Sequence, residues 1–442
     1  MKLMAAEERA FAETKESREG LKGLGRPAVT AAVDLGASKV ACFIMKPEGV
    51  RSGDRTIAAA GVGYVQSRGV RAGAVVDVDE AAHAVAQAVE RAEGHAGVSV
   101  SGVTVAVSGA GLASQRLSGT IPLGARPIAE ADLSRAVAAA AAGLKTPGRR
   151  IIHVRPIAWT IDGQQKVRDP RGMFGRSLNL QLLIVSMSEA KFQTLAHSIE
   201  RAHLQLEGVV AAPFASALAA LEEDEMELGA LCIDMGGGST SVAMFSGGSL
   251  THVDSLAVGG AHVTADVARG LSTSIAGAER IKTLHGSAIA SANEDREMIE
   301  APPRGDDPGA GPVVAPRSLL KGIIAPRVEE TLELLRERLK SAEVAIEPGA
   351  GIVLTGGASQ LAGVREVAVR VFDRPVRLGR PRRMPHLADA ASGPAFCAAG
   401  GVLHRAAFGP PEAALGRSAS GRGRAAQGNV VVRATTWLRE NL

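Results

Sequence analysis

The chain of 442 residues carries the same short motif twice, and this duplication constrains its fold more than any other feature. Residues 32–40 read AVDLGASKV, and residues 232–240 read CIDMGGGST. In each copy an apolar segment leads into Asp-x-Gly, a turn of small and hydroxyl residues follows, and a second apolar segment returns. Two copies of one strand–turn–strand unit predict an α/β protein with two similarly folded halves.

Both turns have the residue types of a phosphate-binding loop. Glycines let the backbone come close to phosphate oxygens, and the exposed N–H groups form an anion-binding concavity. Hydroxyl side chains add donors, and a lysine adds positive charge. The candidate phosphate-binding residues are Gly36, Ala37, Ser38, Lys39, Gly236, Gly237, Gly238, Ser239 and Thr240.

One aspartate in each turn, Asp34 or Asp234, predicts a magnesium site. Mg²⁺ prefers one or two carboxylates together with its own water molecules. A single Asp-x-Gly turn is more often an ordinary hairpin, but a pair with matched apolar flanks is much harder to obtain by chance. The pair therefore favours a phosphate ligand that carries Mg²⁺.

A third glycine-rich turn predicts a surface for the adenine ring. Residues 351–359, GIVLTGGAS, run from a strand into a double glycine, and a helix follows. Backbone without side chains offers a flat surface to a planar ring. The residues expected there are Gly356, Gly357, Ala358 and Leu361.

Two further pairs belong to the same predicted site. Gly259 and Gly260 open a helix, whose N-terminal N–H groups can face phosphates. Glu279 and Lys282 lie three residues apart on one face of a predicted helix. They either hold the ribose and the base edge or form an ordinary surface ion pair.

Together these segments resemble the superfamily of actins, heat-shock chaperones and sugar kinases. Within it the chain is most similar to the FtsA family of bacterial cell division proteins, from about residue 29 to residue 407. The segments that carry the resemblance are 69–77 (GVRAGAVVD), 107–110 (VSGA), 118–119 (SG), 258–262 (VGGAH), 278–282 (AERIK) and 324–330 (IAPRVEE).

The resemblance implies an actin-like two-lobed ATPase fold with ribonuclease-H-like duplicated halves and an inserted 1C subdomain of the SHS2 type. Both ends of the chain are expected to lie outside the two lobes. The expected parts are a flexible leader (1–28), subdomain 1A (29–100 and 185–227, with the joining helix 394–408), subdomain 1C (101–184), subdomain 2A (228–258 and 345–393), subdomain 2B (259–344), a flexible linker (409–428) and an amphipathic helix (429–442).

The resemblance also implies ATP and Mg²⁺ as cofactors. The implied partners are FtsZ, bound through 259–344, further copies of the chain in a polymer, and other division proteins. In the faster ATPases of the superfamily a Gln or an acid just before the first joining helix orients the attacking water. Ala212 stands at that position here. Alanine cannot position water, so slow hydrolysis is expected.

The last residues of the chain predict an amphipathic helix that lies on a membrane. Its apolar face carries a tryptophan and is flanked by arginines, a combination typical of helices in the lipid interface. The alternative is a terminal helix that packs on its own domain or on a partner. The predicted membrane-facing residues are Val430, Val431, Ala434, Trp437, Leu438 and Leu442.

Composition excludes some classes of function and location. Aromatic residues make up 3% of the chain and the net charge is +4, which argues against a nucleic-acid partner. No segment is long and apolar enough to span a bilayer. Without such a segment, the protein is expected to be cytosolic unless something at its surface holds it to a membrane. The resemblance then implies a peripheral location on the cytoplasmic face of the inner membrane, at the division site.

Two alternatives remain at this point: a sugar or small-acid kinase of the same superfamily, and another actin-like adaptor related to pilus or shape-determining proteins. Three further parts of the chain have no assigned role: an acidic run, a segment rich in proline and glycine, and a set of arginines. The acidic run 222–227 is expected as a solvated loop, and residues 301–317 as a surface loop. The arginines form either a lipid or partner surface or a solvated run, and they are Arg370, Arg374, Arg377, Arg380, Arg382 and Arg383.

Overall fold

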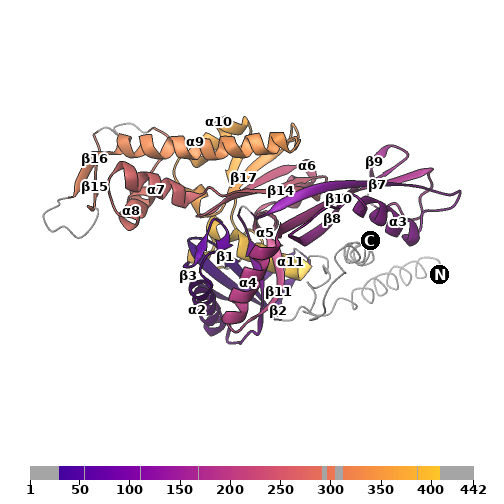
Figure 1. The fold of residues 1–442 in the computed structure, drawn as a ribbon, viewed down its shortest axis with the longest axis horizontal. Helices are drawn as coiled ribbons and strands as arrows, with labels where there is room; N and C mark the ends of the chain where they lie inside the picture. Colours follow the sequence, from indigo (N-terminus) through magenta and orange to yellow (C-terminus); the bar gives the residue numbers. More distant parts are fainter. Residues whose placement is uncertain are drawn as a thin grey trace, which may run out of the picture.

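The structure is a computed structural model in which two β-sheet lobes meet and a third, elongated unit extends from them (Figure 1). The expected leader 1–28, linker 409–428 and amphipathic helix 429–442 lie outside the described residues. The description covers residues 29–408 except for 54, 110, 168, 291–295, 304–311, 386 and the side chains of 164–166.

The first lobe is built on a five-stranded sheet of mainly apolar segments. Its strand order is β11 (Gln205–Ala211), β6 (Gly102–Val107), β1 (Thr30–Leu35), β2 (Lys39–Arg51) and β3 (Thr56–Gln66). The strands β1, β2 and β3 are antiparallel, and β6 and β11 continue the sheet in parallel. Consecutive residues 31–33 are all buried, because helices cover both faces of the sheet.

The second lobe repeats this plan. Its strand order is β14 (Ser249–Leu256), β13 (Thr240–Ser246), β12 (Ala230–Met235), β17 (Gly351–Thr355) and β18 (Val376–Leu378). Three strands are again antiparallel, and two are again added in parallel. The prediction of two similarly folded halves is therefore confirmed.

Two helices of small residues join the lobes. The helix α5 (Ala212–Ala220) contacts strands of both sheets, and it packs against α11 (Cys397–Phe408). A Cβ atom on Gly401 would lie 1.7 Å from the carbonyl oxygen of Ala215, so only glycine permits this close crossing. The crossing lies beside the site where the two lobes meet.

The helix α2 (Val78–Ala96) has the capping residues and the apolar face that predict a helix from sequence. Its N-cap is Asp77, whose Oδ1 accepts a hydrogen bond from the N–H of Glu80 at 3.0 Å. It ends at Gly97, which has a φ of 64°. Its apolar stripe is buried against β2 and β3. The helix α4 (Glu189–Arg201) packs beside it.

The elongated unit is inserted between β6 and β11. Its sheet has the order β7 (Ala113–Pro122), β10 (Ser177–Ser188), β8 (Arg149–Ile161) and β9 (Gln164–Val167). The helix α3 (Glu130–Ala141) covers one face and closes a separate core around Leu133 and Trp159. The expected boundary at residue 101 is wrong, because β6 is a central strand of the first sheet.

The outer part of the second lobe is mainly helical. It contains α7 (Gly260–Gly270), α8 (Ile275–His285), α9 (Arg317–Ser341) and α10 (Val364–Phe372). Part of the expected surface loop 301–317 is instead a two-stranded ribbon of β15 (Met298–Ala301) and β16 (Val313–Pro316). Residues 304–311 lie outside the described part of the chain.

The acidic run is not a solvated loop, because residues 223–228 form the short helix α6 (Glu223–Leu228). Three of the six arginines of the basic run pair with glutamates of the acidic run, so part of the basic run has partners within the protein. The pairs are Arg377 with Glu225, Arg382 with Glu222 at 3.1 Å and Arg383 with Glu223 at 3.4 Å.

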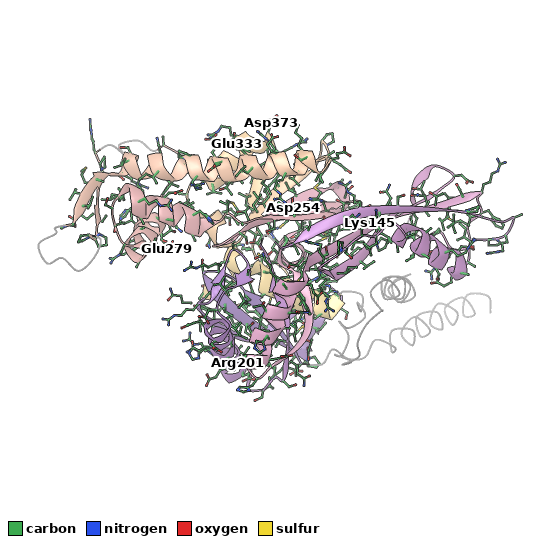
Figure 2. All side chains as sticks on the ribbon, in the orientation of Figure 1. Lys145, Arg201, Asp254, Glu279, Glu333 and Asp373 are labelled. Atoms are coloured by element: carbon green, nitrogen blue, oxygen red, sulfur yellow. The ribbon has the colours of Figure 1, made fainter. Side chains whose placement is uncertain are left out.

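On the opposite side of the second sheet, Arg338 of α9 binds both carboxylate oxygens of Asp254 at 2.8 and 2.9 Å, and Figure 2 labels Asp254 near the centre of the molecule. Among the described helices, none combines the length and the apolar character needed to cross a membrane.

Candidate nucleotide-binding site

The two predicted phosphate turns have the same backbone geometry. In the first, the N–H of Gly36 donates to the carbonyl oxygen of Lys39 at 3.1 Å. In the second, the N–H of Gly236 donates to the carbonyl oxygen of Ser239 at 2.8 Å. The flanking strands pair in the same register, with the aspartate of each motif seven positions before its partner, as in Asp34 with Ala41. The duplicated sequence therefore folds into a duplicated turn.

The two turns face each other where the lobes meet. A Cβ atom on Gly237 would lie 1.8 Å from Ser38 Oγ. A Cβ atom on Gly238 would lie 2.7 Å from the Cβ of Ala37 and 2.9 Å from the backbone nitrogen of Ala72, in the tight turn between β4 (Val70–Arg71) and β5 (Ala74–Val75). Glycine is required here because the two lobes approach each other backbone to backbone.

The segment at the start of α7 joins the second turn. The N–H of Gly260 donates to the carbonyl oxygen of Gly236 at 3.0 Å, and the N–H of Ala261 donates to that of Gly237 at 2.7 Å. A Cβ atom on Gly260 would lie 3.2 Å from the Cβ of Ala358. Three predicted segments, far apart in sequence, therefore meet within the second lobe.

Glu279 and Lys282 of α8 point toward this meeting point rather than forming only a surface pair. Lys282 is 13% exposed, and its Nζ donates to Glu279 at 2.7 Å, to Thr264 Oγ1 at 2.9 Å and to the carbonyl oxygen of Gly260 at 3.3 Å. Sequence reasoning missed Thr264. Its place one helical turn after Gly260 on α7 was the signal that could have found it.

The third glycine turn follows β17 directly. Gly356 has a φ of 83°, and a Cβ atom on it would lie 2.4 Å from Asp234 Oδ1. The turn continues as the short 3₁₀ helix η2 (Gly357–Gln360). Leu361, which follows it, is partly buried against the core of the second lobe. The turn thus lies directly beside the aspartate of the second motif.

Asp34 and Asp234 are both half-buried, and their charges interact. Burial raises the pKa of the Asp34 carboxyl to about 6; the positive charge of Lys39 opposes this rise and the charge of Asp234 adds to it. Burial also raises the pKa of Asp234, against a hydrogen bond from Ser216 Oγ at 2.6 Å and the charge of Lys39. Two such carboxylates fit Mg²⁺, which takes carboxylate oxygens and keeps several waters.

Lys39 provides the positive charge next to both aspartates. Burial lowers the pKa of its ammonium group, whereas Asp34 and Asp234 raise it. Its Nζ donates to the carbonyl oxygen of Ala395 and lies 3.5 Å from the centre of the Phe396 ring. Sequence reasoning missed Ser216, Ala395 and Phe396, because they come from the two joining segments and reach the site only through the tertiary fold.

Two predicted hydroxyl donors of the second turn are engaged inside the protein. The Thr240 hydroxyl donates to the carbonyl oxygen of Val258 at 2.8 Å, and its side chain is fully buried. The Ser239 hydroxyl donates to Ser108 Oγ at 3.2 Å, next to the start of the insert. In this structure Thr240 therefore supports the segment before Gly259.

Comparison with known proteins places this geometry in a family. The model of the family "Cell division protein FtsA" matches residues 231–401, and the model "SHS2 domain inserted in FTSA" matches residues 109–186. The curated protein "Cell division protein FtsA" of Rhizobium meliloti (strain 1021) is 41% identical over 384 residues, which cover 86% of this chain and 87% of the relative. The chain belongs to the FtsA family.

A second FtsA, from Escherichia coli (strain K12), is 31% identical over 418 residues, covering 92% of this chain and 97% of that protein. Among solved structures, the "PilM-PilN type IV pilus biogenesis complex" matches with a TM-score of 0.61 at 16% identity, covering 86% of this chain and 99% of that one. MreB5 of Spiroplasma citri bound to ADP matches with a TM-score of 0.51 at 15% identity, covering 86% and 96%.

These likenesses confirm the actin-like fold and the resemblance to FtsA. The SHS2 match at 109–186 coincides with the strands β7 to β10, which supports a start of the insert after β6. The family is one of cell division proteins, and that much of the functional prediction is confirmed.

Proposed function

We propose that this FtsA-family protein binds Mg-ATP between its two lobes and acts as a polymerising adaptor that ties FtsZ filaments to the cytoplasmic membrane. The observation that carries the proposal is the convergence of both phosphate turns, the start of α7 and the third glycine turn at one place. A nucleotide there would touch both lobes, and it would therefore favour their closed arrangement.

Each part of the site has a chemical task in this proposal. The backbone N–H groups of the two turns and Lys39 would bind phosphate oxygens. Asp34 and Asp234 would hold Mg²⁺ through its waters. Ala358 and Lys282 lie next to Gly260, and Lys282 binds Glu279. The candidates for the adenosine part are Glu279, Lys282, Gly356, Gly357, Ala358 and Leu361.

Hydrolysis is proposed to be slow. Ala212 is the first residue of α5 and is buried, and its methyl group can neither orient a water molecule nor accept its proton. We expect a turnover below about 1 per second. A phosphate-release assay with the full chain would measure it, and a rate typical of metabolic enzymes would contradict this part of the proposal.

The outer part of the second lobe, residues 259–344, is the proposed FtsZ-binding surface. Large apolar side chains are more than half exposed there, namely Ile275, Leu284, Met298 and Val314. They lie on α8 and on the neighbouring ribbon of β15 and β16, and exposed apolar side chains are available for contact with a partner. Co-sedimentation with purified FtsZ filaments tests this proposed surface. Ile275→Asp and Leu284→Asp should each reduce the amount of protein that sediments with the filaments.

Membrane attachment is proposed for residues 429–442, which lie outside the described residues. A short helix binds weakly alone, but copies held in one polymer bind together because each attached helix raises the local concentration of the next. Removal of 429–442 should release the protein from anionic vesicles in a sedimentation assay. Retention on the vesicles would contradict the anchor without touching the nucleotide site. Recruitment of later division proteins to the division site would follow from this attachment.

A further inference from the structure

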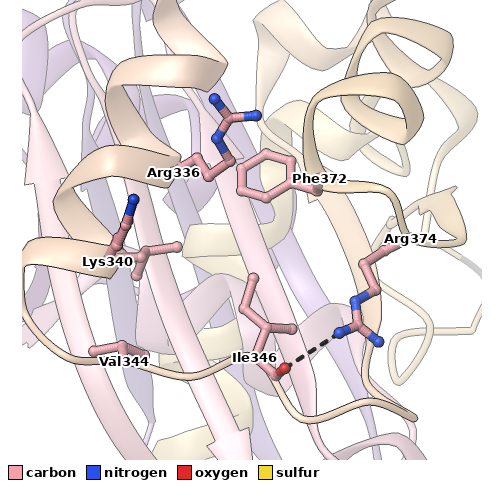
Figure 3. Close-up of a pocket in the computed structure, with 7 residues that line it drawn as sticks. Arg336, Lys340, Val344, Ile346, Phe372 and Arg374 are labelled. Carbon is pink, nitrogen blue, oxygen red and sulfur yellow. Dashed lines mark hydrogen bonds between the residues drawn. The ribbon is translucent and has the colours of Figure 1, made fainter.

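A second candidate site lies at the C-terminal ends of α9 and α10, where a surface pocket of about 240 Å³ opens (Figure 3). None of the residues that line it belongs to the candidate nucleotide site. The lining residues are Arg336, Leu339, Lys340, Val344, Ile346, Phe372 and Arg374.

The floor of the pocket is apolar. Leu339, Val344 and Phe372 are 2%, 8% and 8% exposed, and Ile346 is half-buried beside them. Figure 3 shows the Phe372 ring next to the side chain of Arg336. An apolar group placed on this floor would leave water, which favours binding.

The rim carries three cations that lack strong carboxylate partners. Other arginines of α9 do have such partners: Arg317 pairs with Glu297, Arg327 with Asp266 and Arg338 with Asp254, all at 2.6–2.8 Å. Among the described residues, Lys340 and Arg374 lie in no ion pair, and Arg336 reaches only Glu337, at 3.6 Å. The pocket therefore combines three positive charges that have no close carboxylate partner and are offset only by the partial negative charge at the C-terminal ends of the two helices.

Two of these cations are held in place by neutral groups. Arg336 Nη1 donates to the carbonyl oxygen of Val371 at 2.9 Å, and Arg374 Nη2 donates to that of Ile346 at 3.4 Å, the contact that Figure 3 marks. Carbonyl oxygens orient a guanidinium group but do not neutralise it. Like charges fixed around one pocket repel one another, and an anion would relieve that repulsion.

We propose that this pocket binds a short acidic peptide segment of a partner protein, with one apolar side chain on the floor and neighbouring carboxylates on the rim. Guanidinium groups bind carboxylates through paired hydrogen bonds. The volume is below the roughly 300–1,000 Å³ of typical small-molecule sites, so one or two side chains fill it. A nucleic-acid strand would need stacking rings and more cations. The proposal does not depend on nucleotide binding.

The test uses the full chain and a fluorescein-labelled peptide of alternating aspartate and leucine, followed by fluorescence anisotropy. We expect saturable binding that Lys340→Glu weakens at least about fivefold. The matched control is Lys145→Glu, which makes the same charge change at an exposed lysine of the insert (Figure 2). The control should bind like the wild type.

Two further probes separate the contributions of charge and apolar surface. The same peptide with asparagine for aspartate, or with serine for leucine, should bind at least about fivefold more weakly. Equal binding of the asparagine peptide, or equal losses in Lys340→Glu and Lys145→Glu, would overturn the proposal. So would a Lys340→Glu variant that loses binding to phosphatidylglycerol vesicles but keeps the peptide. Arg374→Gln provides a second rim variant, and its folding is checked by thermal unfolding. It should also bind the peptide more weakly than the wild type does.

Discussion

The turn at residues 36–39 and the turn at residues 236–239 share register and closing hydrogen bond, yet their side chains differ. The first turn carries Ser38 and Lys39, whereas the second consists mainly of glycine. The first therefore brings charge to the meeting point of the lobes, and the second leaves the space that lets the first come close. The two turns therefore share a backbone geometry, whereas their side chains differ in charge and size.

The two aspartates differ in the same way. Asp34 has Lys39 as its charged neighbour, whereas Asp234 has Lys39 and also a hydrogen bond from Ser216. Lys39 thus serves both halves of the molecule, and Ser216 serves only the second. Substitutions at these positions should affect the two turns unequally.

The largest effect is expected for Lys39→Ala. Removal of this ammonium leaves two half-buried carboxyl groups without their positive neighbour and also removes the contacts with Ala395 and Phe396, so the free energy of unfolding should fall by about 3–5 kcal/mol. The matched change in the second turn, Ser239→Ala, should cost only about 1 kcal/mol. Urea denaturation at neutral pH measures both. Equal losses would show that the turns do not divide their roles.

The next effect concerns pH. The folded pKa of Asp34 is about 6 and its ordinary value is 3.8, so the folded protein holds this proton more tightly than the unfolded chain does. Lowering the pH from about 7 to about 4 should therefore raise the free energy of unfolding, by up to about 3 kcal/mol from this group.

Asp34→Asn should remove this contribution. The measurement is the difference in unfolding free energy between wild type and Asp34→Asn across that range, with EDTA present to exclude divalent ions. The account would be wrong about Asp34 if the difference did not change with pH.

A smaller effect is expected from the glycines of the second turn. Gly238→Ala places a methyl group 2.7 Å from the Cβ of Ala37 and 2.9 Å from the backbone nitrogen of Ala72, neither of which can rotate away. ATP affinity should fall by about 10–100-fold. Gly236→Ala is the control, because its methyl group would meet only the Ser239 carbonyl oxygen, at 3.2 Å. Calorimetric titration with ATP measures both variants. Equal losses of ATP affinity in Gly238→Ala and Gly236→Ala would argue against the close approach of the lobes.

A small effect is also expected for Ser216→Ala, in the second half of the site. The variant loses one hydrogen bond to Asp234, which should cost about 1.5 kcal/mol of unfolding free energy. The pKa of Asp234 should rise further, because that hydrogen bond opposes the effect of burial. Thermal unfolding of the wild type and of Ser216→Ala at neutral pH measures this loss. Equal stability of the two proteins would contradict a stabilising hydrogen bond from Ser216 to Asp234.

Sequence alone predicted the features that depend on local patterns. The paired turns, the capped helix α2 and the helix that begins at Gly260 each follow from residues close together in the chain. The expectation that Glu279 and Lys282 share one face of a helix also follows from helical spacing. Such patterns succeed because short-range geometry and burial agree there.

Sequence failed where long-range packing decides. The apolar strand β6 reads like any other strand, and only its pairing with β1 and β11 places it in the first sheet rather than in the insert. Local sequence also did not show that three arginines, more than 140 residues away, pair with the acidic run beside α6. Ser216 and Phe396 reach Asp234 and Lys39 through the crossing of α5 with α11, which no local pattern records.

The most direct test of the central claim is a crystal structure of the full chain grown with Mg²⁺ and a non-hydrolysable ATP analogue. The account predicts one nucleotide between the lobes, with its phosphates held by the turns at 36–39 and 236–239 and its adenine beside Gly356 and Gly357. A nucleotide bound to one lobe only, or at another surface, would contradict it.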